Sequence, residues 1–338
     1  MCNRSIDYNF SQSFQWCSAA WNIIDHPQRR QLYCLVGWVD NRIALIWPFV
    51  ILRRGLWLTL HPLGSETTEY SDVLVEDSPE ADHWVAQAWQ KLRTTCNSDI
   101  INLPFVRTSS RLHRIVSQER PMSAWVNPIS SVSWNGYENW ESYYQSLKKD
   151  FRHSLRRKRR RLAERGNLSF EAVTKHEQLP LIIDWLFSHK TEWLIRTKQR
   201  GPWQDAEVYK KFLVAVAAKE PEIGGIMLFF LKLDDEIISV SLVRISKCSV
   251  EGLISAFDRT YDKCGPGQLL HENIIRWAFE RRLAYDFRIG MESYKDAWTN
   301  CKSEVITYRF VNSILGEAFS LASRCRSKLQ SLRHGLLR

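Results

Sequence analysis

The residues best suited to chemistry lie in one stretch of the chain, from Gly252 to Trp298. The pattern predicts a strand over 253–257, a loop that ends in 264–267, a helix over 268–281 and a strand over 284–289. Polar side chains follow at the end of the last strand, and these are Asp286, Glu292, Tyr294 and Lys295. An acid there, or a water molecule that it holds, could accept a proton from an attacking nucleophile, while Tyr294 or Lys295 could stabilise a departing group.

The same polar side chains also have a structural interpretation. Asp286 could cap a turn or pair with Lys295, and Tyr294 could be a half-buried aromatic residue. The catalytic hypothesis therefore names Asp286, Tyr294 and Lys295, with His189 and Glu292 as the next candidates.

The loop before the predicted helix could bind an anion. A helix that begins directly after a glycine-rich loop offers unpaired backbone N–H groups and the positive end of its dipole. Glycine lets the backbone approach a ligand closely, and proline stiffens the turn. A pyrophosphate would fit there, and its contacts would come from Gly265, Pro266, Gly267, Gln268 and Leu269. A plain turn is the alternative.

The positive charge of the chain is concentrated in two segments. Residues 148–165 hold ten Lys and Arg against two acids, and residues 318–338 hold five Lys and Arg and no acid, within a net charge of +10. The second segment could form an amphipathic helix that rests on a partner or a membrane surface, or it could be a solvated terminus. The basic pI therefore describes these two segments and not the whole surface.

The first basic segment reads as a helix with one apolar stripe, which consists of Leu147, Phe151, Leu155 and Leu162. Gly166 is well placed to end it. Basic residues flank the stripe, and we expect Arg152, Arg156 and Arg160 to face a groove for a phosphate-bearing or otherwise acidic acceptor. A solvated charged face is the alternative.

Two similar strand hairpins must frame these residues. The first runs over 32–39 and 43–52 with a third strand at 56–60, and the second over 226–233 and 237–245 with a third strand at 250–257. Further patterns predict helices around 84–92, 181–194 and 205–218, with a polar turn at 201–204. We therefore predict an α/β (α+β) chain of two similar mixed-sheet halves flanked by helices, with a boundary in 122–137.

Composition excludes several classes of protein. Hydrophobic residues make up 44% and charged residues 25% of the 338 residues, which is typical of a globular chain of about two domains. The longest apolar run, 43–52, is too short to cross a bilayer, and the first 20 residues contain no apolar stretch of signal-peptide length. The eight cysteines form no C-x-x-C pair, and H-E-x-x-H is absent. We expect a cytoplasmic protein without a metal.

Several of these motifs together resemble the CelD/BcsL-like (BioF2-like) acetyltransferases of the GNAT superfamily. The resemblance covers roughly residues 30 to 312 and is carried by Leu63-Gly64, Glu69-Tyr70-Ser71-Asp72, Tyr144-x-Ser146-Leu147, Arg152, Arg156, Arg157, Leu162, Gly166, His189, Trp193, Pro266-Gly267, Leu269-Leu270, Asp286-Phe287, Gly290, Tyr294-Lys295 and Trp298. The chain departs from the family at Gly265, where serine is usual, and at Arg281-Arg282, where a glycine is common.

The resemblance implies a tandem GNAT-like fold with an amino-terminal half over 1–125, an acyltransferase half over 126–315 and a basic tail over 316–338. It implies acetyl-CoA or another acyl-CoA as donor, held at 265–269, and an amine or hydroxyl acceptor near Arg152, Arg156, Arg160, His189 and Trp193. An exposed edge amide of the 253–257 strand could polarise the thioester carbonyl. Family members are often encoded with exopolysaccharide or cellulose synthesis, so the resemblance suggests a sugar acceptor.

Two alternatives stay open from the sequence. Fem-type transferases share the architecture and use aminoacyl-tRNA, and the basic helix at 148–165 would suit such a donor. A non-catalytic protein that binds nucleic acid or a surface is the other alternative. Acyl-CoA transfer is the first choice because the motif match is closer, and under it we do not expect nucleic acid as a partner.

Overall fold

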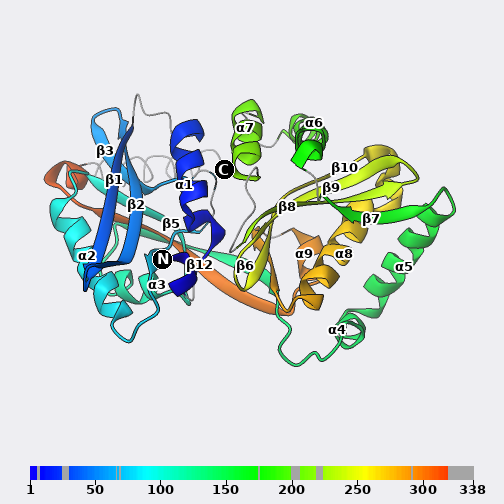
Figure 1. The fold of residues 1–338 in the computed structure, drawn as a ribbon, viewed down its shortest axis with the longest axis horizontal. Helices are drawn as coiled ribbons and strands as arrows, with labels where there is room; N and C mark the ends of the chain where they lie inside the picture. Colours follow the sequence, from blue (N-terminus) through cyan, green and yellow to red (C-terminus); the bar gives the residue numbers. More distant parts are fainter. Residues whose placement is uncertain are drawn as a thin grey trace, which may run out of the picture. The chain divides into compact units, whose positions relative to one another are not determined.

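The computed structural model describes residues 1–5, 8–24, 30–65, 67, 70–173, 176–198, 206–217, 224–290 and 292–318 (Figure 1). The predicted turn at 201–204, the motif residue Glu69 and the tail from 319 onward lie outside these residues. The chain divides into two compact units, one of Met1–Asp7, Ala20–Asn127 and Glu304–Arg338, the other of Tyr8–Ala19 and Pro128–Ser303. The limits 1–125, 126–315 and 316–338 stay a prediction.

The first unit is built on a mixed sheet with strand order β1-β2-β3-β5-β12 and β4 paired to β2. The pairs β1/β2, β2/β3, β2/β4 and β5/β12 are antiparallel, and β3/β5 is parallel. The strands are β1 (Arg30–Val39), β2 (Arg42–Arg54), β3 (Trp57–Pro62), β4 (Leu74–Val75), β5 (Ile100–Arg107) and β12 (Cys301–Val311). The predicted first hairpin is therefore confirmed, and its turn places Asp40 and Asn41 at φ 47° and 59°.

Helices α2 (Ala81–Thr95) and α3 (Arg111–Val116) pack on this sheet. The apolar side of α2, which includes Val85, Trp89 and Leu92, is buried in the core of the unit. The predicted helix around 84–92 is thus confirmed, although it begins at Ala81 with Glu80 as its N-cap residue. The short helices η1 (Cys2–Arg4) and η3 (Ala20–Ile24) complete the described part of the unit.

The second unit has a mixed sheet with strand order β6-β11-β10-β9-β8-β7. Only β10/β11 is parallel, and the other pairs that define the sheet are antiparallel within the described residues. The strands are β6 (Ser123–Val132), β7 (Leu168–Ala172), β8 (Gly225–Leu233), β9 (Glu236–Ile245), β10 (Ser249–Phe257) and β11 (Ala284–Ile289). The second predicted hairpin and the strand after it are confirmed.

Helices cover both faces of the second sheet (Figure 1). α8 (Pro266–Glu280) packs on β8 to β11, while α6 (Leu179–Thr197) contacts β9 and β10 and α7 (Ala206–Ala217) contacts β8 on the opposite face. α5 (Lys149–Ala163) packs on α8, and α1 (Phe14–Ala19) packs on α7. The remaining helices are η2 (Phe10–Gln12), α4 (Trp140–Ser146), η5 (His176–Gln178), η7 (Arg259–Cys264) and α9 (Ser293–Asp296).

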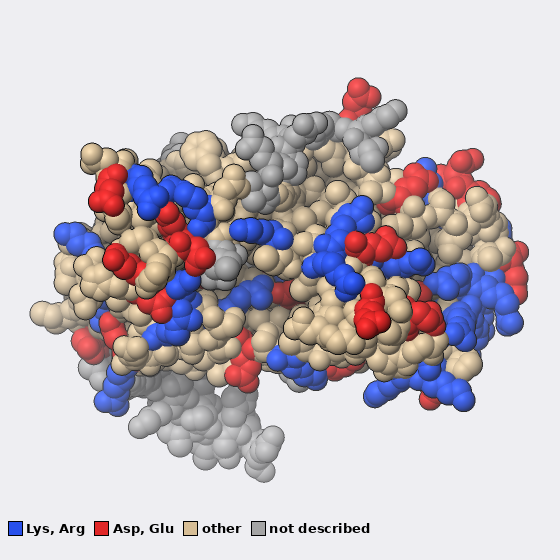
Figure 2. Space-filling model, turned by 60° about the horizontal axis from the view of Figure 1, so that its bottom comes forward, with Lys and Arg blue, Asp and Glu red and all other residues tan. Residues whose placement is uncertain are grey.

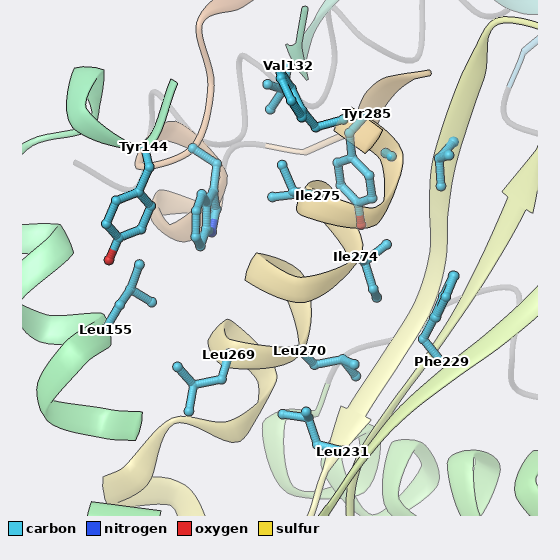
Figure 3. Packing of buried hydrophobic residues seen from close by; sticks show 14 of the residues in the cluster. Val132, Tyr144, Leu155, Phe229, Leu231, Leu269, Leu270, Ile274, Ile275 and Tyr285 are labelled. Carbon is cyan, nitrogen blue, oxygen red and sulfur yellow. The ribbon is translucent and has the colours of Figure 1, made fainter. Parts of the chain in front are cut away.

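Figure 3 shows how α8 builds the core of the second unit. Leu269, Leu270, Ile274 and Ile275 lie between α5 on one side and β8 on the other. The stripe predicted for the basic helix joins the same core, since Leu155 and Leu162 are fully buried. The α/β architecture of two mixed-sheet halves flanked by helices is therefore confirmed. Among the described residues, none of the helices has the length and apolar character needed to cross a membrane.

Candidate active site

Strands β10 and β11 start as neighbours and then part. Their parallel ladder joins 249–251 to 284–286 and goes no further within the described residues. β10 carries a bulge between Gly252 and Ile254 on its β9 side. An extra residue in one strand bends it away from its partner, so the β11 side of β10 is an open strand edge from Leu253 to Phe257. Such an edge presents backbone N–H groups that can donate to a carbonyl oxygen.

Gly252 allows this bulge to sit against an aromatic hydroxyl. A Cβ at Gly252 would lie 3.0 Å from the Oη of Tyr285, so any larger residue would push the tyrosine away. The Oη of Tyr285 is 3.3 Å from Nδ1 of His271, and both residues are buried. Burial raises the pKa of Tyr285, while burial and the charge of Lys295 lower the pKa of His271 to about 4. Both side chains are therefore neutral near pH 7.

The open edge leads into the predicted donor loop. After β10, Asp258 caps η7 by accepting the N–H of Thr260, and Gly265 then adopts φ 56° and ψ 51°. Glycine reaches this left-handed conformation at little cost, which lets α8 begin directly at Pro266. The helix thus starts two residues earlier than predicted, because proline fits the first helical position.

The five predicted donor residues do not contribute in the same way. The N–H groups of Gln268 and Leu269 donate to the carbonyl of Gly265, at 3.1 and 3.4 Å. The side chains of Pro266 and Leu269 are buried in the core, so they shape the helix start and do not face outward. Gly267 is partly exposed, and a Cβ there would meet only the ring of Phe257, at 3.4 Å. Gly265, Gly267 and Gln268 are therefore the accessible part of the loop.

Lys158 of α5 lies at the start of α8, a contact that the sequence did not reveal. Its Nζ donates to the side-chain oxygen of Gln268, and it lies 3.3 Å from the position of a Cβ on Gly265. Burial, and then the charge of Arg157, lower the pKa of Lys158. A cation beside the positive end of a helix is unfavourable unless an anion lies between them. The arrangement therefore favours an anionic ligand at this helix start.

Lys295 and Glu292 form a compact ion pair behind the end of β11. The Nζ of Lys295 lies 2.8 Å from Oε2 of Glu292 and donates to the carbonyl of Ile289 at 2.9 Å. Gly290 has a φ of 131°, and a Cβ there would come within 2.7 Å of the Lys295 Nζ. Burial acts to raise the pKa of Glu292, but the hydrogen bond from Lys295 and the charges of Lys295 and Lys190 lower it overall.

Tyr294 joins this group through its ring. It stacks on His271 with 5.5 Å between ring centroids and meets Phe287 edge-on at 6.2 Å. Burial, and then the charge of Glu292, raise the pKa of Tyr294 to about 12. Its hydroxyl is thus a hydrogen-bond donor at neutral pH. The structure brings Tyr294, Lys295 and Glu292 together on the four-residue helix α9 and the residue before it.

Asp286 lies on the opposite face of β11 from this aromatic group. Side chains alternate along a strand, so Asp286 points away from the face of Tyr285 and Phe287. The residue is 3% exposed, and its Oδ1 accepts the backbone N–H of Arg288 at 2.6 Å. The structure therefore shows a backbone contact of Asp286, while its role as a base stays a prediction.

The three arginines proposed to face an acceptor differ in their surroundings. Arg152 is partly buried, Arg156 is exposed and hydrogen-bonds Tyr144, and the side chain of Arg160 is 75% exposed with Glu164 at 3.5 Å. Figure 2 shows Lys and Arg gathered at the end of the molecule where α5 lies. A cavity of about 610 Å³ between α5, β7 and α8 is lined by a different arginine, Arg159, which pairs with the buried Glu272 at 2.7 Å.

On α6, the predicted residues lie beside a lysine that sequence reasoning missed. The His189 ring stacks on Trp185 at 3.8 Å, with Nδ1 at 2.9 Å from the Trp185 carbonyl. Lys190 places its Nζ 4.0 Å from the centre of the Trp193 ring. Burial lowers the pKa of Lys190 and the nearby Glu292 opposes this, so α6 is electrostatically coupled to the end of β11. The run His189-Lys190 within the family motif was the signal available in the sequence.

The described residues include no group of three or more His, Cys, Asp or Glu that could hold a metal ion. The Gly265–Lys158 region and the open edge of β10 are instead suited to an anionic organic ligand with a carbonyl group.

Comparison with solved structures shows the same fold in other proteins. FemX has a TM-score of 0.64 at 11% identity, over 94% of this chain and 96% of its own. A conserved protein of unknown function from Bacteroides thetaiotaomicron has a TM-score of 0.53 at 11% identity, over 90% and 92%. The C-terminal domain of a protein assigned as a lysylphosphatidylglycerol synthetase from Agrobacterium fabrum has 0.51 at 13% identity, over 90% and 94%.

Comparison of the sequence with known families gives a match within the second unit. No curated protein matches the chain. Residues 149–296 match the acetyltransferase (GNAT) domain family, and this range contains α5, the donor loop, the open edge of β10 and α9. Residues 149–296 therefore resemble a GNAT acetyltransferase domain, the chain has a tandem GNAT-like fold, and the protein is an acyltransferase.

Proposed function

We propose that the protein is a CelD/BcsL-like acyltransferase that uses acetyl-CoA or another acyl-CoA and acylates an amine or hydroxyl of a sugar in exopolysaccharide or cellulose-type synthesis. The observation that carries the proposal is the open edge of β10 directly before the glycine loop and the start of α8. The edge would take the thioester carbonyl while the loop takes the pyrophosphate. Lys158 adds a positive charge at the same point.

In this proposal Asp286, or a water molecule that it holds, accepts the proton of the acceptor nucleophile as the nucleophile attacks the thioester carbonyl carbon. The C–S bond then breaks, and CoA leaves as a thiolate. Edge N–H groups of 253–257 stabilise the negative charge that develops on the carbonyl oxygen. Tyr294 donates its hydroxyl hydrogen bond to the departing sulfur, and Lys295 holds the loop that carries Tyr294 and Glu292. Arg152, Arg156 and Arg160 attract an acidic acceptor, and His189 and Trp193 border it.

Ligand binding tests the donor directly. A ligand at about 100 times its Kd adds about 2.7 kcal/mol to the free energy of unfolding, which raises Tm by several degrees. We expect such a rise in a thermal-shift series with acetyl-CoA and longer acyl-CoAs, and none with adenosine. The absence of a shift with every acyl-CoA at millimolar concentration would refute the donor assignment.

A Fem-type reaction with an aminoacyl-tRNA donor is the second candidate. It is favoured by the FemX-like fold across 94% of the chain and by the exposed basic side of α5, which includes Arg156, Arg157 and Arg160. Contacts to phosphates weaken steeply with salt. RNA that co-purifies at low salt and leaves at high salt, together with no acyl-CoA shift, would favour this candidate.

The first proposal also includes three further expectations. These are localisation in the cytoplasm, peripheral membrane contact of the basic tail and the absence of a metal.

A further inference from the structure

Arg288 combines an unusual backbone conformation with a buried guanidinium, at the point where β10 and β11 part. Its φ is 62°, a region that residues other than glycine rarely adopt, and the residue is 6% exposed. The conformation is held by Asp286, whose Oδ1 accepts the Arg288 N–H at 2.6 Å. Backbone strain that a buried contact maintains is concentrated at functional sites.

The guanidinium of Arg288 contacts β10 beyond the point where the β10/β11 ladder ends. Nη1 of Arg288 donates to the carbonyl of Leu253 at 3.3 Å. Leu253 is the extra residue of the bulge, because Gly252 pairs with Val243 and Ile254 pairs with Leu242. A side chain of β11 thus holds the first residue of the open edge, in a place where no backbone ladder is described between these two strands.

The base of this connection is a row of buried charges. In the strand register Glu251 lies opposite Arg244 on β9 and opposite Asp286 on β11. Arg244 and Glu251 are both fully buried and form an ion pair, and Asn9 donates to the other carboxylate oxygen of Glu251 at 2.5 Å. Shifting any of these strands would expose or separate buried charges at high cost. Arg288 therefore extends from these buried charges to the extra residue of the bulge.

We propose that Arg288 is a positioning residue for acyl transfer: it fixes the Leu253 carbonyl so that the edge N–H groups that follow remain directed at the thioester carbonyl. The inference rests on the proposed function. The inference gives Asp286 a supporting role in the same positioning, because its carboxylate accepts the backbone N–H of Arg288. The pyrophosphate of acetyl-CoA would be held by the loop at 265–268, away from the contact of Arg288 with Leu253, so most of the binding energy should not depend on Arg288.

The test compares Arg288→Gly with a matched control, Arg282→Gly. Arg282 also has a positive φ, 56°, and also donates to backbone carbonyls, those of Tyr137 and Glu138 at 3.1 Å each, but it precedes β11. Glycine is relaxed at both positions, so both variants should fold. The readouts are amide hydrogen exchange in 249–257, the Kd for acetyl-CoA, and the rate of CoA release from acetyl-CoA with hydroxylamine as nucleophile.

For Arg288→Gly we expect exchange in 252–257 to rise about tenfold or more and kcat to fall about tenfold or more, with Kd changed by less than about threefold. Arg282→Gly should match wild type in all three. Arg288→Lys keeps a cation, so its exchange and kcat should lie between those of wild type and Arg288→Gly. This variant also tests the proposal if Arg288→Gly does not fold. Wild-type exchange and kcat in Arg288→Gly, or an equal loss in Arg282→Gly, would overturn the role of Arg288.

Failure of the proposed function gives a different result. In that case wild type neither binds nor turns over acetyl-CoA, and the role in acyl transfer falls with it. Equal exchange in Arg288→Gly and wild type overturns the Arg288 connection itself, whatever the donor. The exchange measurement and the acetyl-CoA measurements therefore separate the two failures.

Discussion

At the scale of single residues, the environment of His271 alters its acid–base chemistry. It lies on α8 between Tyr285, Phe287 and Tyr294, and burial together with Lys295 lowers its pKa to about 4. An imidazole held neutral in this way is a poor general acid at neutral pH. Its role is to support the Tyr285 and Tyr294 rings at the base of the open edge.

The depressed pKa of His271 makes stability depend on pH. The unfolded chain binds a proton at His271 near pH 6.5 and the folded chain only near pH 4, so the unfolded state binds more protons between these values. Above pH 6.5 His271 is neutral in both states and does not lower the free energy of unfolding. As the pH falls from 6.5 towards 4, His271 lowers the free energy of unfolding by up to about 3 kcal/mol. Urea denaturation at pH 7 and 4.5 measures the loss.

His271→Gln is the control for this prediction, since it removes the titrating group and keeps a side chain able to hydrogen-bond Tyr285. Carboxylates titrate in both proteins, so only the difference between wild type and variant reports on His271. An equal loss of stability in the two proteins would show that His271 titrates normally.

Tyr294 and Lys295 can be tested by catalysis. Tyr294→Phe keeps the ring stacked on His271 but removes the hydroxyl, and we expect kcat to fall by about 10² to 10⁴ with folding and CoA binding retained. Lys295→Met releases Glu292 and the Ile289 carbonyl, so it should lower kcat and also weaken donor binding. Steady-state kinetics with circular dichroism as the folding check decides; a loss below tenfold in both variants would place catalysis elsewhere.

Asp286→Asn separates the two roles of Asp286. The amide oxygen of asparagine can still accept the Arg288 N–H, so a positioning role predicts that kcat stays within about tenfold of wild type. The predicted role as general base requires the carboxylate and would cost about 10² to 10⁴ in kcat. The same steady-state assay therefore distinguishes a base from a backbone anchor.

At the scale of elements, the start of α8 is the proposed donor site. A Cβ at Gly267 would make only an ordinary contact with Phe257, so Gly267→Ala should leave the acyl-CoA thermal shift nearly intact. Gly267→Trp places a large ring over the helix start and should abolish the shift. Equal shifts in the two variants would move the pyrophosphate away from this loop.

The two sides of the basic helix α5 differ in their contacts and exposure. Lys158, Arg159 and Arg161 contact Gln268, Glu272 and the Lys263 carbonyl, and so they attach α5 to α8 and η7. The other flank of α5, which carries Arg156 and Arg160, is exposed.

Replacing Arg152, Arg156 and Arg160 together with Gln should raise the KM for an acidic acceptor and leave acyl-CoA affinity nearly unchanged, because charge on this flank attracts the acceptor and not the donor. Arg276→Gln is the control, since Arg276 is also an exposed helical arginine, on α8, paired with Glu280 at 3.2 Å. Kinetics identical to wild type would show that this flank is only a solvated charged face. Loss of bound RNA would point to the Fem-type candidate.

For the whole molecule, the amino-terminal segment Tyr8–Ala19 belongs with the second unit although residues on both sides of it belong with the first. Trp16 is 1% exposed, meets the Phe212 ring at 5.0 Å and lies beneath the Arg244 guanidinium at 5.3 Å. The second unit therefore depends on residues more than a hundred positions earlier in the chain.

Trp16→Ala should lower the free energy of unfolding by about 3 to 5 kcal/mol, because it leaves a cavity beside a buried charge. Phe14→Ala, two residues away and 87% exposed, should change it by less than about 0.5 kcal/mol. Urea denaturation of both variants provides the comparison, and similar stabilities would show that the segment is not part of the core of the second unit.

Local patterns in the sequence were enough to predict the local elements and the glycine loop before α8. Alternation and turn residues predicted both hairpins, helical spacing predicted α2 and α5, and Gly265-Pro266-Gly267 marked the start of α8, because each signal depends only on neighbours in the chain. The polar residues after β11 were also visible as a group.

How these residues combine depends on contacts between distant parts of the fold. The opening of β10 from β11, the approach of Lys158 to Gln268 and the reach of Arg288 to Leu253 all join residues far apart in the chain. Strand register and side-chain direction decided that Tyr294 and Asp286 lie on opposite sides of β11. Such contacts depend on packing between distant segments, which local patterns do not contain.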